Sequence, residues 1–211
     1  MRLHGFFRSS SAWRVRIALA IKGASYDAVP RNFRKAEQRA AGYLTLNPQG
    51  LVPALETGEG VLIQSLAIIE YLEETLQGPA LLPSDAFARA QVRGMAQLIA
   101  CDIHPINNLR ILDYLRGSLR ASDDAVNDWY RYWVEAGFAA LEILVAKEGD
   151  GRHCFGNSVT IADLCLVPQM YNARRFGVDV AAYPKLVAVD AHLCTLDAFA
   201  TTVPEQQADA V

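Results

Sequence analysis

The chain has 211 residues, 20 of them basic and 23 acidic, and a formal net charge of −3 at pH 7. This length allows one large or two small domains with a hydrophobic core. The small net charge and the lack of a basic stripe argue against nucleic-acid binding. No apolar run reaches the roughly 18 residues of a membrane-spanning helix, so we expect neither nucleic acid nor membrane as a partner.

The N-terminal residues and the cysteines predict a cytoplasmic location. Arg8, Arg14 and Arg16 interrupt any signal-peptide core. The four cysteines are scattered, without a C-x-x-C pair or metal-ligand spacing, and most have apolar neighbours, so we interpret them as reduced core thiols. The four histidines form no H-x-x-x-H pair, and we therefore expect no metal site.

The first 80 residues predict a small α/β domain. Apolar residues recur at helical spacing over 13–22 and are followed by Gly23, where a helix C-cap is expected. Gly58-Glu59-Gly60 predicts a tight hairpin. Alternating strands and helices before a hairpin are typical of a small mixed sheet covered by helices. The expected elements are a strand at 2–7, a helix at 13–22, a strand at 26–32, a weak helix at 34–46, strands at 52–56 and 61–63, and a helix at 65–76.

Residues 86–211 predict a second, all-helical domain. The segment 78–85 is rich in glycine and proline and is the best linker candidate. Residues 204–211 are small or polar, and we expect them to be loose. The fold class is therefore α/β plus all-α, with domains at 1–80 and 86–211. Helical patterns cover 87–115, 124–147, 160–174 and 185–199.

The first candidate site is Arg8-Ser9-Ser10-Ser11, between the first strand and the first helix. Hydroxyls at a helix N-terminus adjoin unpaired backbone N–H groups and the positive end of the helix dipole, which favours an anion. A thiolate held there would have a lowered pKa. The alternative interpretation is that one serine only caps the helix.

Two further candidates lie in the first domain. Val52-Pro53 would leave the Val52 backbone free to bind an extended peptide if the bond were cis, but few X–Pro bonds are cis, so the residues alone favour an ordinary edge-strand proline. Gln64-Ser65 precedes an apolar helix, and we expect Ser65 to be its N-cap. The same helix start could bind a carboxylate through backbone N–H groups.

In the second domain, Pro105 is expected to bend the helix predicted over 87–115. His104, Asn107 and Asn108 lie at i, i+3 and i+4, so we expect them to share a face. They either line a cleft or satisfy the backbone groups that Pro105 frees. Further along, Thr160-Ile161-Ala162-Asp163 resembles a capping box.

Several segments resemble the signatures of zeta-class glutathione transferases, and the resemblance covers nearly the whole chain. That family includes maleylacetoacetate isomerases and bacterial maleylpyruvate isomerases, and residues 101–108 with Arg110 are most similar to the maleylpyruvate branch. The chain departs in one place, because Ser11 stands where the family often has cysteine, which weakens any thiol-exchange activity. The matching segments are 7–19 (FRSSSAWRVRIAL), 47–55 (NPQGLVPAL), 64–72 (QSLAIIEYL), 163–169 (DLCLVPQ) and Arg175-Phe176.

The resemblance implies a homodimeric protein with a glutathione transferase fold, in which a thioredoxin-like domain (βαβαββα) precedes a helical bundle. It implies that the first-loop serines hold the thiolate of glutathione, with Ser9 favoured because it adjoins Arg8. It also implies a cis Pro53. The residues implied for glutathione are Ser9, Ser10, Ser11, Gln38, Gln49, Val52, Pro53, Gln64 and Ser65, with Asp102, His104 and Asn108 contributed by the second domain or by a partner chain.

The activity that the resemblance implies is glutathione-dependent cis–trans isomerisation of a maleyl keto acid, either maleylpyruvate or maleylacetoacetate, in aromatic degradation. Glutathione would add its thiolate to the double bond and leave after rotation, and would thus act as a cofactor. Arg8, Arg110 and Arg175 are candidates to bind a dicarboxylate, because guanidinium pairs bidentately with carboxylate. The alternatives are a broader transferase acting on α-halo acids and a non-catalytic binding module.

Overall fold

A computed structural model describes residues 1–210, which form two compact units. The first unit contains residues 1–81 and the segment from Thr195 onward, and the second unit contains Leu82–Cys194. The tail from Thr195 onward was expected in the second domain, but it groups with the first unit. No helix of residues 1–210 has the length and apolar character to cross a membrane.

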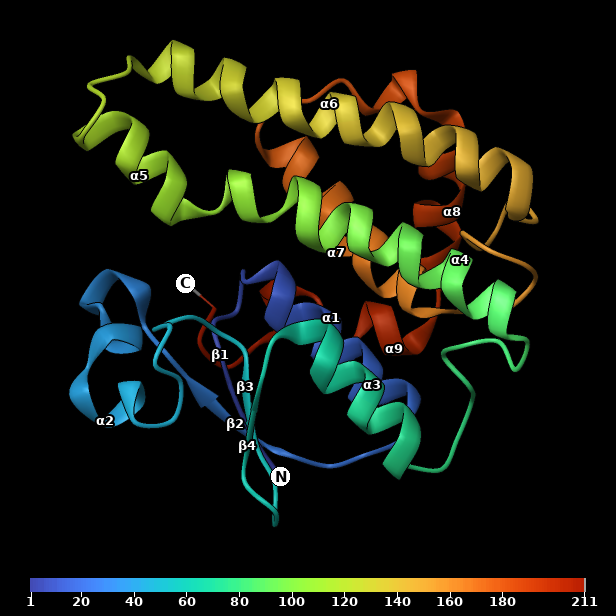
Figure 1. The fold of residues 1–211 in the computed structure, drawn as a ribbon, viewed down its shortest axis with the longest axis horizontal. Helices are drawn as coiled ribbons and strands as arrows, with labels where there is room; N and C mark the ends of the chain where they lie inside the picture. The colour runs from blue at the N-terminus through green and yellow to red at the C-terminus, as the bar shows by residue number, and fades with distance from the viewer. Residues whose placement is uncertain (211) are drawn as a thin grey trace. The chain divides into compact units, whose positions relative to one another are not determined.

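A four-stranded mixed sheet with helices α1 and α3 beside it forms the first unit (Figure 1). Strand β1 is parallel to β2 and antiparallel to β3, and β3 is antiparallel to β4. The predicted order of strands and helices is confirmed, although three of the four strands are shorter than expected. The elements are β1 (Arg2–Gly5), α1 (Ser10–Ile21), β2 (Asp27–Pro30), α2 (Ala41–Leu44), β3 (Ala54–Glu56), β4 (Val61–Ile63) and α3 (Ser65–Thr75), with sheet order β2-β1-β3-β4.

Helix α1 is buried along most of its surface. Val15, Ile17 and Leu19 have no exposed area, and even Arg14 is only 1% exposed. Burial of each aliphatic side chain of this size contributes roughly 1.5–3 kcal/mol, so the helix is fixed firmly in the first unit. It ends as predicted at Gly23, whose φ of 62° is left-handed and therefore suits glycine.

The C-terminal segment is attached to α1 by hydrogen bonds. It contains α9 (Asp197–Ala200) and a 3₁₀ turn at Pro204–Gln206. The Trp13 indole Nε1 donates to Thr202 Oγ1 at 3.0 Å, and Arg16 Nε donates to the Thr202 carbonyl at 3.2 Å. These bonds explain why the tail groups with the first unit. The expectation of a loose tail at 204–211 is wrong over 204–210, where Phe7 N–H donates to Asp209 at 3.0 Å.

The second unit is built from packed helices (Figure 1). Helix α7 packs against α4 and α8, and α8 packs against α6. The single helix expected at 87–115 is interrupted, because π-helical and 3₁₀ turns at Leu98–Ile103 and Pro105–Asn107 separate α4 from α5 around Pro105. The helices are α4 (Ala86–Gln97), α5 (Leu109–Gly117), α6 (Asp123–Glu148), α7 (Ile161–Arg175) and α8 (Pro184–Leu193).

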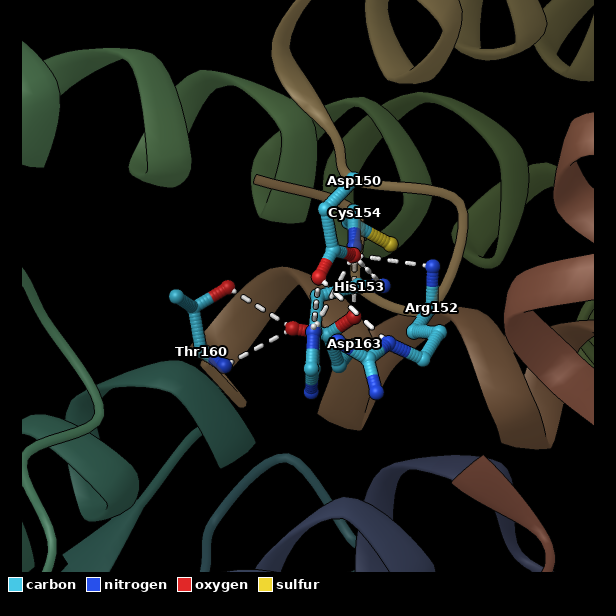
Figure 2. A network of polar contacts seen from close by, with 6 residues as sticks. All are labelled: Asp150, Arg152, His153, Cys154, Thr160 and Asp163. Atoms are coloured by element: carbon cyan, nitrogen blue, oxygen red, sulfur yellow. Dashed lines mark hydrogen bonds and ion pairs between the residues drawn. The ribbon is translucent and has the colours of Figure 1, made fainter. Parts of the chain in front are cut away.

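The predicted capping box at the start of α7 is confirmed (Figure 2). Thr160 Oγ1 accepts from the Ala162 N–H at 3.3 Å. Asp163 is fully buried and accepts from Thr160 N–H at 2.7 Å, from Thr160 Oγ1 at 3.0 Å and from Cys154 N–H at 2.8 Å. The carboxylate therefore joins the α7 N-terminus to the loop that precedes it.

Candidate functional site

The start of α1 brings two of the three predicted serines together. A turn closed by the Ser9 N–H to Phe6 carbonyl bond (2.9 Å) places Ser9 at the N-cap. Ser9 Oγ accepts from Ala12 N–H at 3.2 Å and lies 3.1 Å from Ser11 Oγ. Ser10 is the first helical residue and is buried. The serine cap is therefore confirmed, and it leaves the predicted anion site open, because the remaining N–H groups still carry the positive end of the helix dipole.

The Val52-Pro53 peptide adjoins these serines and is cis. The trans bond favoured from the residues alone is wrong, and the cis bond implied by the resemblance is present. Ser11 Oγ donates to the Val52 carbonyl at 3.0 Å. The Val52 N–H has no hydrogen-bond acceptor among residues 1–210, so it remains available to an extended peptide.

Two side chains hold the preceding carbonyl, that of Leu51. The Tyr43 hydroxyl donates to it at 2.5 Å, and Asn47 Nδ2 donates at 2.7 Å. Tyr43 is 1% exposed and packs with Val52 in one apolar cluster. The Tyr43 hydroxyl and the Asn47 amide thus fix the backbone of the loop that carries Val52.

The start of α3 departs from the prediction. The N-cap is Gln64 rather than Ser65, and its φ of 71° and ψ of 118° are rare for a residue other than glycine. Such backbone strain costs on the order of 1–3 kcal/mol and is concentrated at functional sites. Gln64 Nε2 donates to Gln49 Oε1 at 2.9 Å. Ser65 Oγ instead accepts from Arg14 Nη1 at 3.4 Å.

Two polar side chains of the first unit have buried atoms without a hydrogen-bond partner among residues 1–210. Gln38 Oε1 is buried and unpaired, and so are Nε and Nη2 of Arg14. Buried polar groups normally have partners, so these atoms are candidates to contact a ligand. Gln38 was implied by the resemblance. Arg14 was considered only as a residue that interrupts a signal-peptide core.

A buried histidine network lies on the sheet and was not predicted. His4 is 1% exposed, with Nε2 2.5 Å from Glu56 Oε1 and Nδ1 2.7 Å from Arg31 Nη2. Because guanidinium only donates, Nδ1 accepts and Nε2 carries the proton, so His4 is neutral. Arg31 also lies 4.9 Å above the Tyr43 ring. The network therefore reaches the residue that holds the Leu51 carbonyl.

Burial lowers the pKa of His4 below its ordinary value of 6.5, although the bond to Glu56 opposes the shift. The unfolded chain then binds a proton near pH 6.5 that the folded chain does not. We expect the free energy of unfolding to fall as the pH is lowered from 6.5 to 5.5, with a contribution from this residue of at most about 1.4 kcal/mol per pH unit. Glu56 titrates lower, because the hydrogen bond from His4 lowers its pKa below 4.5.

Urea unfolding at pH 7.5, 6.5 and 5.5 checks this prediction. The matched variant is His4→Gln, which keeps polar atoms at the position but cannot titrate. Its unfolding free energy should decline less over the same interval. Equal slopes for the two proteins would contradict the assignment of the effect to His4.

The candidate residues of the second unit do not share one helical face. Asn108 has extended backbone (φ −68°, ψ 149°) and caps α5 by accepting from Arg110 N–H at 3.3 Å. The predicted common face of His104, Asn107 and Asn108 is therefore wrong, because the helical backbone ends at Asn107 and Asn108 is extended. Asp102 is exposed. Asn107 is buried, and its Nδ2 donates to the Tyr130 carbonyl at 3.5 Å.

The three candidate arginines have exposed or partly exposed side chains. Arg8 lies 4.8 Å above the Phe7 ring. Arg110 is in the first turn of α5, and Arg175 ends α7, where it donates to Asn172 Oδ1 at 3.3 Å and lies near the Phe176 ring. Among residues 1–210, no group of three or more His, Cys, Asp or Glu side chains could hold a metal ion.

Comparisons with known proteins match the N-terminal domain to a family model and nearly the whole chain to individual relatives. The model for the glutathione S-transferase N-terminal domain matches residues 1–74. Maleylpyruvate isomerase of Ralstonia sp is 50% identical over 210 residues, covering 99% of both chains. Maleylacetoacetate isomerase of Pseudomonas aeruginosa is 47% identical over 212 residues, covering 99% of this chain and 98% of the relative.

Solved structures give the same result. The holo structure of a maleylpyruvate isomerase, a bacterial glutathione S-transferase of the zeta class, has a TM-score of 0.97 and 50% identity over 100% of both chains. Maleylacetoacetate isomerase from Methylobacterium extorquens, with malonate and glutathione bound, has a TM-score of 0.96 and 39% identity over 100% of both chains. The thioredoxin-like sheet unit, the helical unit and this full-length identity together place the chain in the zeta-class glutathione S-transferase family.

Proposed function

We propose that this chain is a glutathione-dependent cis–trans isomerase that converts a maleyl keto acid, maleylpyruvate or maleylacetoacetate, to its fumaryl isomer in the degradation of aromatic compounds. The observation that carries the proposal is the start of α1, where Ser9 and Ser11 meet the cis Val52-Pro53 peptide. The relatives with these isomerase names match the chain over nearly its full length.

Glutathione fits the polar groups at this place. We propose that Ser9, Ser10 and Ser11 hold its thiolate, because the positive end of the α1 dipole stabilises an anion. The Val52 N–H, which has no acceptor among residues 1–210, would bind the cysteinyl carbonyl of the tripeptide. Pro53 keeps that backbone turned toward the serines. The similar Methylobacterium structure was solved with glutathione bound.

The α3 start is proposed to bind the γ-glutamyl carboxylate. Ser65 accepts a hydrogen bond from Arg14, so its own proton remains free to bind an anion. Arg14 adds a buried positive charge with two unpaired nitrogens, and the α3 N–H groups add the dipole. Gln38, Gln49 and Gln64 supply amides nearby. For Asp102, His104 and Asn108 the role in glutathione binding remains a proposal from the resemblance alone.

When bound, glutathione supplies a thiolate that adds reversibly to the conjugated double bond and so permits its rotation. The residues of the chain ionise the thiol, bind the substrate carboxylates and stabilise the charge that develops during the reaction. The serines and the α1 N-terminus keep the thiol ionised at neutral pH. Arg8, Arg110 and Arg175 are proposed to bind carboxylate groups of the substrate and the charge that develops next to them.

A spectrophotometric assay tests the function directly. The absorbance of maleylpyruvate and of maleylacetoacetate is followed with enzyme, with and without glutathione. We expect isomerisation that requires glutathione, and the ratio of kcat/KM values identifies the preferred substrate. Isomerisation that proceeds equally without glutathione would refute the mechanism, and turnover of α-halo acids alone would favour the broader transferase.

Arg110 offers a sharper prediction about the substrate. Its side chain is exposed on α5, and no carboxylate within residues 1–210 forms a salt bridge with it. We expect Arg110→Ala to raise KM for the dicarboxylate by about tenfold or more, because charge-assisted hydrogen bonds contribute about 1.5–3 kcal/mol. The KM for glutathione should change little. Steady-state kinetics with each substrate varied in turn checks the prediction.

The matched control is Arg116→Ala on the same helix, where the arginine pairs with Asp123 at 2.8 Å. It removes the same charge from α5. A rise in KM for the dicarboxylate of equal size in both variants would show that net charge, rather than Arg110, causes the effect.

We also propose that the protein is a cytoplasmic homodimer. All four cysteines are free thiols, with Cys154 and Cys165 buried, which suits a reducing compartment. Light scattering of the purified protein tests the dimer, since a mass near the 23.2 kDa of one chain would refute it.

A further inference from the structure

The two peptide groups that flank Phe7 each form a hydrogen bond with a side chain from another part of the chain. Its N–H donates to Asp209 Oδ2 at 3.0 Å, and its carbonyl accepts from Arg16 Nη2 at 2.9 Å. Arg16 comes from the middle of α1 and Asp209 from the C-terminal tail, 202 positions away from Phe7. Sequence inspection gave no indication of this arrangement, because it assigned the tail to the second domain.

Two of the three residues of this clamp on Phe7 are buried, and Asp209 is partly buried. Phe7 is 4% exposed and Arg16 is 5% exposed. Burial lowers the pKa of Arg16 to about 10, with Tyr26 and then Asp209 opposing the shift, so the guanidinium stays cationic at neutral pH. Asp209 therefore accepts from a buried N–H, and its charge also favours the buried Arg16 cation. Electrostatic interactions of this kind contribute more free energy where water is excluded.

The clamp adjoins the residues proposed to act on glutathione. Phe7 and Arg8 are the central residues of the turn closed by the Ser9 N–H to Phe6 carbonyl bond. That turn sets Ser9 as the N-cap of α1. A rotation of either peptide group beside Phe7 would therefore shift the backbone of Arg8 and Ser9 and move the Ser9 hydroxyl relative to Ser11. Displacements of about 1 Å at such positions are enough to lower rates strongly.

We propose that Asp209 is a positioning residue for the catalytic loop, and that with Arg16 it fixes the backbone on both sides of Phe7 so that Arg8 and Ser9 face the glutathione thiol correctly. This inference rests on the proposed function for its effect on catalysis. The two hydrogen bonds at Phe7 are themselves independent of that function. The tail thereby has a role in the active site that its position in the sequence does not suggest.

The test compares Asp209→Ala, Asp209→Asn and the control Asp197→Ala. Alanine removes the acceptor, whereas asparagine keeps a carbonyl oxygen that can accept from the Phe7 N–H. Asp197 is an exposed carboxylate in the same C-terminal segment. The measurements are kcat and KM with glutathione, the pKa of the bound glutathione thiol from its thiolate absorbance, the melting temperature, and amide hydrogen exchange of residues 7–11 without ligand.

We expect Asp209→Ala to lower kcat about tenfold, the factor that corresponds to loss of one hydrogen bond of about 1.4 kcal/mol. The bound thiol pKa should rise and exchange at residues 7–11 should become faster, while Asp209→Asn regains most of the activity. Asp197→Ala should match the wild type. The proposal is overturned if Asp209→Ala keeps the wild-type kcat and thiol pKa, or if it only lowers the melting temperature with unchanged exchange at 7–11.

Failure of the inference and failure of the proposed function remain distinguishable. If the wild-type protein isomerises neither maleyl keto acid, the proposed function fails. Hydrogen exchange in the glutathione-free protein then still shows whether Asp209 fixes the loop. If the wild type is active and Asp209→Ala is equally active, only the positioning role fails.

Discussion

Replacing Ser9 by alanine should lower kcat by about 10²-fold and raise the pKa of the bound glutathione thiol by about 1–2 pH units. The Ser11 hydroxyl donates to the Val52 carbonyl, which directs the Ser9 proton toward Ser11 Oγ in the absence of ligand. When a thiolate lies beside Ser9, the Ser9 hydroxyl would donate its hydrogen bond to the thiolate sulfur instead of to Ser11 Oγ. Bonds to charged groups contribute about 1.5–3 kcal/mol, and each pH unit corresponds to about 1.4 kcal/mol. Thiolate absorbance against pH, together with kcat, measures both effects.

The control for this prediction is Ser122→Ala. Ser122 caps α6 with the same geometry, since its Oγ accepts from Ala125 N–H at 3.2 Å, the same distance as the bond from Ala12 N–H to Ser9. Both variants should lose about 1 kcal/mol of stability from the lost cap. Only Ser9→Ala should change the thiol pKa. If Ser11→Ala changes it instead and Ser9→Ala does not, the activating hydroxyl is that of Ser11.

Features that depend on neighbours in the sequence were predicted well. Gly23 ends α1, and Thr160 and Asp163 form the capping box, because each requires only residues one to three positions away. The strand and helix order of the first unit follows from hydrophobic periodicity, which is likewise local. Strand ends were less accurate, because pairing with neighbouring strands decides where a strand stops.

Features that depend on tertiary contacts were not predictable from one sequence. The left-handed backbone of Gln64 contradicts its intrinsic preference and requires the surrounding fold to hold it. The His4 network joins residues 27 and 52 positions apart, and the Asp209 bond spans 202. The cis Pro53 was indicated only by the family resemblance, because most X–Pro bonds are trans. The candidate residues could therefore be named from the sequence, whereas the tertiary contacts that hold them in place could not.

Stability of the second unit should depend most on Asp163. The carboxylate has no exposed area and accepts from two backbone N–H groups and one hydroxyl (Figure 2). Burial raises its pKa above 3.8, and the hydrogen bonds from Cys154 and Thr160 oppose that rise. Removing the carboxylate leaves these donors unpaired inside the protein, and each unpaired group costs about 1–3 kcal/mol.

We therefore expect Asp163→Ala to lower the free energy of unfolding by about 4 kcal/mol and the melting temperature by roughly 10 °C. Asp163→Asn keeps acceptor oxygen for part of the network and should lose less. Asp124→Ala on α6 removes an exposed carboxylate from another helix N-terminus and serves as the control, with an expected loss below about 1 kcal/mol. Urea unfolding measures all three. Equal losses for Asp163→Ala and Asp124→Ala would mean that helix-dipole charge alone, rather than the buried hydrogen bonds, sets the contribution of Asp163.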